Sequence, residues 1–246
     1  MVVHVSDATV AAWQGRREQR PRTGPPVLRL EGVSRSFASG AQRVRAVDGL
    51  DLSVWPGELV TIVGRSGSGK STVLHLAGGL ARPDEGRVLL HERDLAELTP
   101  RQLAEVRRRL IGFVFQFFHL LPTLSVAENV GLPLILDGRA PRQATERAGE
   151  LLEAVGLAHR ARHLPGELSG GEMQRVAIAR SLVAAPELIL ADEPTGNLDS
   201  VTGAEVLDVL VSRTRDSGAA LVMVTHDRSI AGRADRSLTL VDGRMA

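Results

Sequence analysis

Short apolar runs alternate with stretches of helical apolar spacing along the chain after residue 26. The short runs predict strands at residues 27–30, 50–54, 59–63, 87–90, 111–115, 188–191, 221–224 and 237–242, the last at the edge of a sheet. The longer stretches predict helices at residues 72–80, 100–110, 125–129, 143–155, 169–184 and 203–213. Strands that alternate with helices form a mainly parallel sheet with helices on both faces, so the expected fold class is α/β.

Two segments depart from this alternation. Residues 1–26 combine clustered arginines with proline and glycine, which predicts a disordered tail; a basic arm that touches lipid or a partner is the alternative. Residues 117–165 begin with a loop rich in large apolar residues and continue with helical patterns. We therefore expect a tail, then one domain over residues 27–246 with a helical insertion at about residues 117–165.

Composition excludes several classes of function. The 246 residues contain no cysteine, so disulfides and cysteine-bound metals are ruled out. A net charge of +1, 3% aromatic residues and no tyrosine argue against a nucleic-acid partner. No run of apolar residues is long enough to span a bilayer, and the first residues do not have the pattern of a signal peptide. We expect a cytoplasmic protein that reaches a membrane only through a partner.

A glycine-rich loop carries the first chemical signal, directly after the predicted strand at 59–63. It consists of Gly64, Arg65, Ser66, Gly67, Ser68, Gly69, Lys70, Ser71 and Thr72, and it fits the phosphate-binding pattern G-x-x-x-x-G-K-[ST]. Lys70 is the only lysine of the chain. A compact ammonium fits between two phosphates where a planar guanidinium does not, so Lys70 is expected to bridge the β- and γ-phosphates. The hydroxyl of Ser71 would hold Mg²⁺.

A second signal lies where the predicted strand at 188–191 ends in two acids. Asp192 can bind Mg²⁺, usually through water, and Glu193 can orient or deprotonate an attacking water. The alternative is a pair of solvated acids at a strand end. The glycine loop earlier in the chain favours the catalytic interpretation.

The segment Leu168-Ser169-Gly170-Gly171-Glu172-Met173-Gln174 resembles the signature motif of ABC-transporter ATPases. Physically it is also a capping box, in which Ser169 caps a helix and Glu172 reaches back. The resemblance implies a P-loop NTPase fold, with a RecA-like mainly parallel sheet, an antiparallel β subdomain and an inserted helical subdomain. It further implies ATP and Mg²⁺ as cofactors, and a head-to-tail dimer in which Ser169, Gly170 and Gly171 cover the nucleotide of the second subunit. The same resemblance implies an integral-membrane permease as partner and a peripheral position on the inner face of the cell membrane.

Four further residues match the family's motifs. The resemblance assigns Phe37 to adenine stacking, although an ordinary core phenylalanine is the alternative. It assigns Gln116 to sensing Mg²⁺ and water, Asp199 to a loop that couples the two sites, and His226 to the γ-phosphate. Arg65 and Met173 depart from the family pattern, and neither change removes a phosphate contact. His159 and His163 have helical spacing but no accompanying acid, so we expect no metal there.

Narrower features suggest a branch of the family. Residues 191–200 and 118–122 look like the branch that serves macrolide exporters, lipoprotein-releasing complexes and the FtsE-type cell-division ATPase. An FtsE-like regulator of a membrane-bound cell-wall or division complex therefore remains an alternative to a transport ATPase. A soluble ABC ATPase of DNA repair or translation would carry long arms, a second cassette or zinc modules, which this chain lacks.

Overall fold

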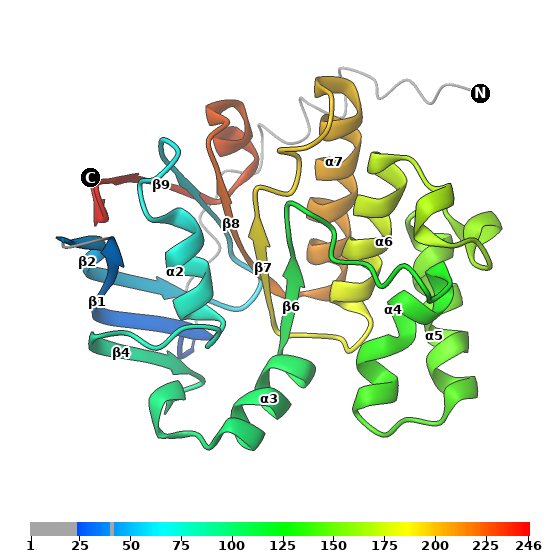
Figure 1. The fold of residues 1–246 in the computed structure, drawn as a ribbon, viewed down its shortest axis with the longest axis horizontal. Coiled ribbons are helices and arrows are strands. Elements are labelled where there is room, and N and C mark those ends of the chain that lie inside the picture. Colours follow the sequence, from blue (N-terminus) through cyan, green and yellow to red (C-terminus); the bar gives the residue numbers. More distant parts are fainter. Residues whose placement is uncertain (1–23, 40–41) are drawn as a thin grey trace.

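A computed structural model describes residues 24–39 and 42–246 of the protein (Figure 1). Its strands are β1 (Leu28–Ser39), β2 (Gln42–Val54), β3 (Leu59–Val63), β4 (Glu85–Leu90), β5 (Arg93–Asp94), β6 (Ile111–Val114), β7 (Leu188–Asp192), β8 (Ala220–Thr225), β9 (Arg236–Val241) and β10 (Arg244–Met245). Its α-helices are α2 (Lys70–Ala77), α3 (Pro100–Arg109), α4 (Val126–Leu136), α5 (Pro141–Ala154), α6 (Gly170–Leu182) and α7 (Ser200–Ser217). Short 3₁₀ helices lie at η1 (Leu95–Glu97), η2 (Ala158–Arg160), η3 (Pro165–Glu167) and η4 (Arg228–Arg233).

The strands form two sheets. An antiparallel sheet of four strands has the order β2-β1-β4-β5, and a sheet of six strands has the order β10-β9-β3-β8-β7-β6. In the larger sheet every pairing is parallel except that of β9 with β10. The prediction of a mainly parallel sheet with an antiparallel β subdomain is therefore confirmed.

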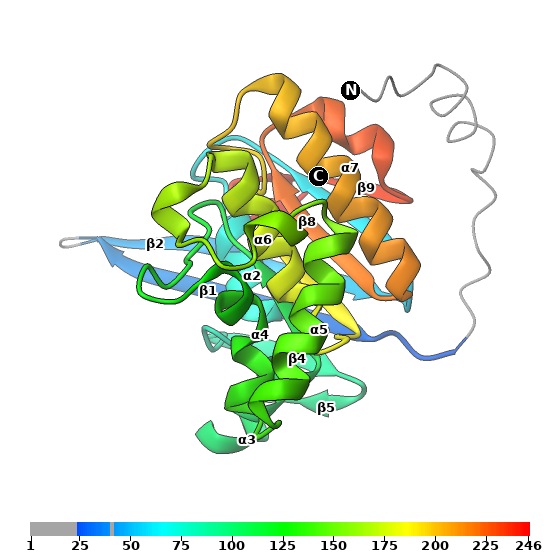
Figure 2. The same cartoon turned by 90° about the vertical axis from the view of Figure 1, so that its right-hand side faces the viewer.

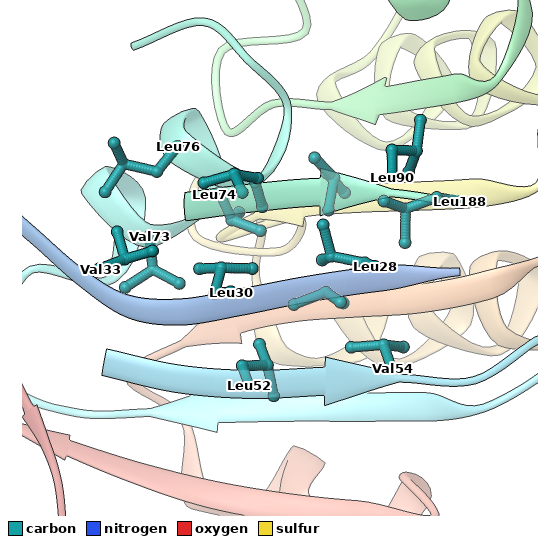
Figure 3. Packing of buried hydrophobic residues seen from close by; sticks show 14 of the residues in the cluster. Leu28, Leu30, Val33, Leu52, Val54, Val73, Leu74, Leu76, Leu90 and Leu188 are labelled. Carbon is teal, nitrogen blue, oxygen red and sulfur yellow. The ribbon is translucent and has the colours of Figure 1, made fainter. Parts of the chain in front are cut away.

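The larger sheet separates two hydrophobic cores, because successive side chains of a strand point to opposite faces. In β7, Leu188 and Leu190 join the core on one face, while Ile189 and Ala191 join the core on the other. The first core packs α2 and the antiparallel sheet, as Figure 3 shows around Leu188. The second core packs α4, α5, α6 and α7. Figures 1 and 2 show these helices gathered on one side of the sheet, away from α2.

Helix boundaries follow from local chemistry. Thr99 caps α3 by accepting from Gln102 N, the Gln102 side chain accepts from Thr99 N in return, and Pro100 occupies the first helical position, as the sequence predicts. Ser125 and Glu128 form the same kind of box before α4. That helix continues through Pro133 to Leu136, well past the predicted end at residue 129.

Two strand predictions need correction. The segment at 237–242 is not an edge strand, because β9 lies between β3 and β10. Asp242 and Gly243 both adopt positive φ and turn the chain back, so Arg244 and Met245 can pair with β9. The strands β1 and β2 are also far longer than the runs at 27–30 and 50–54 predict. The second half of β1 and the first half of β2 are rich in polar and charged residues and contain no apolar run, and the apolar pattern therefore missed them.

The predicted tail at residues 1–26 lies outside the described residues except for its last three. The division into a tail, a domain at 27–246 and a helical insertion at about 117–165 stays a prediction. Within the described ranges 24–39 and 42–246, no helix has the length and apolarity needed to cross a bilayer.

Candidate functional site

The predicted site residues follow four neighbouring strands of the larger sheet. Gly64 follows β3, His226 follows β8, Asp192 ends β7, and Gln116 comes two residues after β6. These strands are parallel and adjacent, in the order β3-β8-β7-β6. Their carboxyl ends therefore meet at one edge of the sheet, which is where open α/β sheets bind ligands.

The glycine loop folds tightly between β3 and α2. Its backbone is tied by hydrogen bonds from Gly64 N to the Thr225 carbonyl (3.3 Å) and from Ser68 N to the Arg65 carbonyl (3.2 Å). Gly69 has φ of 102°, and a Cβ there would lie 2.0 Å from the Ala46 carbonyl oxygen. Because β2 packs directly against the loop, only glycine fits at this position.

The loop presents groups suited to an anion. No side chain caps the N-terminus of α2, so its first N–H groups are available to an acceptor. The hydroxyl of Ser68 is buried and has no hydrogen-bond partner in the described part of the chain. Such unpaired buried donors are rare in folded proteins and indicate a missing partner. A phosphate group supplies the acceptor oxygens that these donors need.

Lys70 crosses the loop and approaches the acids of β7. Its Nζ donates to the carbonyl of Gly64 (2.9 Å) and to that of Arg65 (3.0 Å). The same Nζ lies 3.5 Å from Oε1 of Glu193, and the Lys70 side chain is only 6% exposed. The ammonium is therefore held at the junction of the loop and β7.

The two acids at the end of β7 occupy different environments. Asp192 accepts a hydrogen bond from the Ser71 hydroxyl (3.0 Å), while burial raises the pKa of its carboxyl and the neighbouring Glu193 adds to that rise. Glu193 accepts from the backbone N–H of His226 (3.3 Å), and its Oε2 lies 2.8 Å from His226 Nδ1. Glu193 has φ of 44°, an uncommon conformation for a residue other than glycine. Such residues cluster at active sites.

The donor set around Ser71 and Asp192 fits Mg²⁺. Among the described residues no group of three or more His, Cys, Asp or Glu side chains could hold a metal on its own. Mg²⁺ differs from zinc in needing only one or two protein oxygens, because water and substrate phosphates complete its octahedron. The hydroxyl of Ser71 and the carboxylate of Asp192 are such oxygens. The expectation that His159 and His163 bind no metal stays a prediction.

Gln116 is brought to the loop that follows Glu193. Its Nε2 donates to Oδ1 of Asn197 (3.2 Å), and Nδ2 of Asn197 donates to the Gln116 carbonyl (2.9 Å). A Cβ at Gly196 would lie 2.9 Å from Gln116 Nε2, so the two segments are in close contact. The ends of β6 and β7 are joined through these residues.

The residues of the signature-like segment lie apart from the glycine loop. Ser169 caps α6 through the N–H of Glu172 (3.3 Å), and Glu172 Oε2 accepts from Ser169 N (2.8 Å). Glu172 Oε1 accepts from Arg160 Nε (3.1 Å), and these bonds, led by that from the Ser169 backbone, lower the pKa of Glu172. Because α6 belongs to the second core and α2 to the first, the two predicted anion sites lie on helices that cover opposite faces of the sheet.

A sequence model of the ABC transporter family matches residues 47–196. The chain belongs to this family. It is an ABC ATP-binding protein, which hydrolyses ATP and uses Mg²⁺, so these predictions are confirmed.

Several relatives are similar over most of their length. LolD of Granulibacter bethesdensis, a lipoprotein-releasing system ATP-binding protein, is 50% identical over 218 residues, covering 89% of this chain and 95% of that protein. LolD 2 of Caulobacter vibrioides is 49% identical over 220 residues, covering 89% and 96%. Among solved structures, the ATP-binding cassette MJ0796, as a post-hydrolysis dimer bound to ADP and Pi, has a TM-score of 0.82 and 40% identity, covering 89% and 96%. CbiO1 of Clostridium perfringens, part of the transporter complex cbiONQ, has a TM-score of 0.80 and 26% identity, covering 91% and 88%.

Two sites predicted from the family resemblance have a clear structural setting. Phe37 is 44% exposed, so it is not an ordinary core phenylalanine. It pairs with Val44 of β2, two residues from the Ala46 carbonyl that touches the glycine loop, and the Arg35 guanidinium covers its ring at 5.2 Å. Asp199 caps α7 by accepting from Val201 N and Thr202 N, both at 3.1 Å. The roles of Phe37 and Asp199 in this ABC protein stay predictions.

Sequence reasoning missed two residues that hold the loop after Gln116. Arg180 of α6 donates to the carbonyls of Phe118 and His119, both at 2.6 Å. Asn129 of α4 is completely buried and bonds the loop at residues 121–125. The one signal available was a polar side chain at a position that helical spacing turns inward.

Proposed function

We propose that this chain is the ATPase subunit of a lipoprotein-releasing ABC transporter and works as a homodimer on an integral-membrane permease. The observation that carries the proposal is its identity of 46% to 50% with LolD proteins of several bacteria, over about nine-tenths of the chain. These relatives favour lipoprotein release over the FtsE-like alternative. The ATPase would lie on the inner face of the cell membrane, where the permease anchors it.

Substrate binding falls to the glycine loop. The β- and γ-phosphates of ATP are bound by the backbone N–H groups of residues 64–72 and by the Ser68 hydroxyl, while the exposed face of Phe37 stacks on adenine. The Lys70 ammonium binds the bridging region between these two phosphates and gives up one of its two hydrogen bonds to carbonyls. The buried stem of Lys70 fixes where that charge lies.

Hydrolysis falls to the acids at the end of β7. Glu193 accepts the proton of the attacking water, and the backbone N–H of His226 aims the carboxylate. His226 then donates toward the γ-phosphate, and Gln116 orients the water from the β6 side. Ser71 and Asp192 would hold Mg²⁺, which would supply positive charge beside the phosphate oxygens. The left-handed backbone at Glu193 fixes the carboxylate at this edge of the sheet.

The second subunit completes the site. Because Ser169, Gly170 and Gly171 belong to a helix on the other face of the sheet, they reach a γ-phosphate only in another copy of the chain. MJ0796 is dimeric in two solved structures, one of them bound to ADP and Pi. In our proposal the dimer closes on two ATP molecules and opens after hydrolysis, and Asp199 lies beside the interface between the two sites.

The loop after Gln116 would transmit the closing and opening of the dimer to the permease. Phe117 is 67% exposed and Leu121 is 44% exposed, which is unusual for large apolar side chains placed close together in sequence. A membrane-protein partner that covers them would follow the movement of Gln116.

Replacement of Glu193 by glutamine tests the catalytic proposal. We expect Glu193→Gln to bind ATP and dimerise with it, but to turn over roughly 10²–10⁴ times more slowly, because a positioned base is lost. Glu187→Gln is the matched control, since Glu187 precedes β7 and pairs with His91 on the surface. Wild-type turnover in Glu193→Gln, measured by phosphate release, would contradict the assignment.

The cargo is tested with the co-purified transporter. The trapped Glu193→Gln dimer should retain its permease, which mass spectrometry then identifies. The wild-type complex in proteoliposomes should release an acylated lipoprotein to a carrier in the presence of ATP, and should not release the same protein without its acyl chains. Equal release of both forms, or of neither, would refute the lipoprotein assignment while leaving the ATPase activity intact.

A further inference from the structure

A half-buried arginine fork holds the chain just after Gln116. Nη1 of Arg180 donates to the His119 carbonyl and Nη2 to the Phe118 carbonyl, both at 2.6 Å. Within residues 24–39 and 42–246, no Asp or Glu forms an ion pair with Arg180, and burial lowers its pKa. A guanidinium partly removed from water without a carboxylate needs other acceptors, and the two carbonyls supply them.

The segment that Arg180 holds has a strained backbone. Phe118 has φ of 43° and His119 has φ of 48°, and neither is glycine. The N–H of His119 donates to the Phe117 carbonyl, which closes a turn around Phe118. Left-handed residues of this kind persist only where surrounding contacts fix them. The Arg180 fork binds the carbonyls of Phe118 and His119 and so can fix this turn.

The same helix holds the chain before Gln116. Gln174 of α6 is completely buried, and its Nε2 donates to the Phe115 carbonyl at 3.3 Å. Thus α6, which begins at the signature residues, is attached to the backbone on both sides of Gln116. No side chain of the glycine loop takes part in these bonds.

We propose that Arg180 is a positioning residue for ATP hydrolysis, which fixes the turn at Phe118 and His119 and thereby makes Gln116 move together with α6. The proposal rests on the proposed function, in which Gln116 orients the attacking water. It adds that the signature helix and the permease-facing loop are joined directly at this point. Closure of the dimer on the signature then repositions Gln116 without passing through the nucleotide.

The substitution Arg180→Lys removes the fork and keeps the charge. We expect kcat to fall roughly tenfold, because a charged hydrogen bond is lost from the strained turn. KM for ATP should stay within about twofold of the wild-type value, since α2 and its loop lie on the other face of the sheet. Arg147→Lys is the matched control, because Arg147 is exposed and pairs with Glu150 on the solvent side of α5. All rates are measured well below the unfolding temperature of each variant, so that a merely structural loss does not lower kcat.

A suppressor distinguishes positioning of the turn from packing. Asparagine tolerates the left-handed region better than histidine, so His119→Asn should recover a large part of the kcat lost in Arg180→Lys. The substitution His119→Asn also removes the edge contact of His119 with Phe115. The single variant His119→Asn measures the effect of this loss on kcat, and that effect is subtracted from the double variant. A kcat unchanged by Arg180→Lys, a rise in KM alone, or strictly additive losses with His119→Asn would each overturn the proposal.

Two further outcomes are also decisive. If Arg180→Lys does not fold, Gln174→Met tests the attachment at Phe115, and a kcat within about twofold of wild type would then overturn the proposal. If the wild-type chain itself does not hydrolyse ATP, the proposed function fails and this proposal with it. An active wild type beside an unaffected Arg180→Lys variant refutes only the role of Arg180.

Discussion

The buried amide of Asn129 gives the sharpest stability prediction for the loop after Gln116. Its Oδ1 accepts from Leu121 N (2.7 Å), and its Nδ2 lies 3.0 Å from each of the carbonyls of Leu121, Leu124 and Ser125. The side chain is completely buried, whereas Leu121 is 44% exposed. Asn129 therefore joins α4 to the loop at residues 121–125.

The substitution Asn129→Ala leaves one N–H and three carbonyls without this partner. The carbonyls of Leu121 and Ser125 keep the backbone N–H groups of Leu124 and Asn129, so we count two groups, Leu121 N and the Leu124 carbonyl. Each polar group left unsatisfied away from water costs about 1–3 kcal/mol, so the expected loss in the free energy of unfolding is about 2–6 kcal/mol. For a chain of this size each kcal/mol lowers Tm by about 2–4 °C, so the predicted decrease is roughly 4–24 °C.

Calorimetry without nucleotide measures this decrease. Asn129→Asp keeps the shape and the acceptor oxygen but turns the amide donor toward three carbonyls into a second acceptor, so its Tm should be as low or lower. Gln143→Ala, an exposed amide on α5, is the control and should leave Tm within about 1 °C. The reasoning is refuted if Asn129→Ala melts within about 1 °C of wild type, or if Asn129→Asp is more stable than Asn129→Ala.

Two predictions concern the site itself. Lys70→Ala should abolish ATP binding in equilibrium dialysis, and Lys70→Arg should not restore it, because the fork does not fit the loop; binding by either variant counts against the role of Lys70. Asp192→Asn should raise Tm at neutral pH while turnover with Mg²⁺ is lost. Burial raises the pKa of Asp192, so the folded state holds its proton more tightly, and stability falls as pH rises above the ordinary value of 3.8. The gain should vanish in calorimetry below that pH, and a gain that persists there would show another cause.

The site was predictable where chemistry follows a strand. Residues 59–63 are an apolar run that leads into the glycine pattern, and the structure places β3, the loop and α2 there in that order. The acids Asp192 and Glu193 follow a later apolar run, at residues 188–191, and the strand that this run forms, β7, lies beside β8 in the sheet. Parallel strands bring their carboxyl ends together, so local patterns were enough to predict which residues gather.

Other features depend on contacts that no local pattern records. The left-handed turn at Phe118 and His119 needs Arg180, which is about sixty residues away in sequence. The position of β9 inside the sheet depends on two residues of β10, too short to give a strand pattern. The conformation of Glu193, with φ of 44°, follows from tertiary bonds to β8 and not from its own propensity.

The contrast between Lys70 and Arg180 explains why a chain so rich in arginine has one lysine. Around Lys70, two carbonyls and the Glu193 carboxylate converge on one nitrogen, an arrangement that suits a compact charge with three donors. Around Arg180, the carbonyls of consecutive residues lie side by side, which suits a planar fork with two parallel donors. Each cation is thus selected by the geometry of its acceptors. Lys70 can exchange a carbonyl for a phosphate without changing its own shape, whereas Arg180 holds a fixed pair of backbone groups, and this difference suits one to binding and the other to transmission.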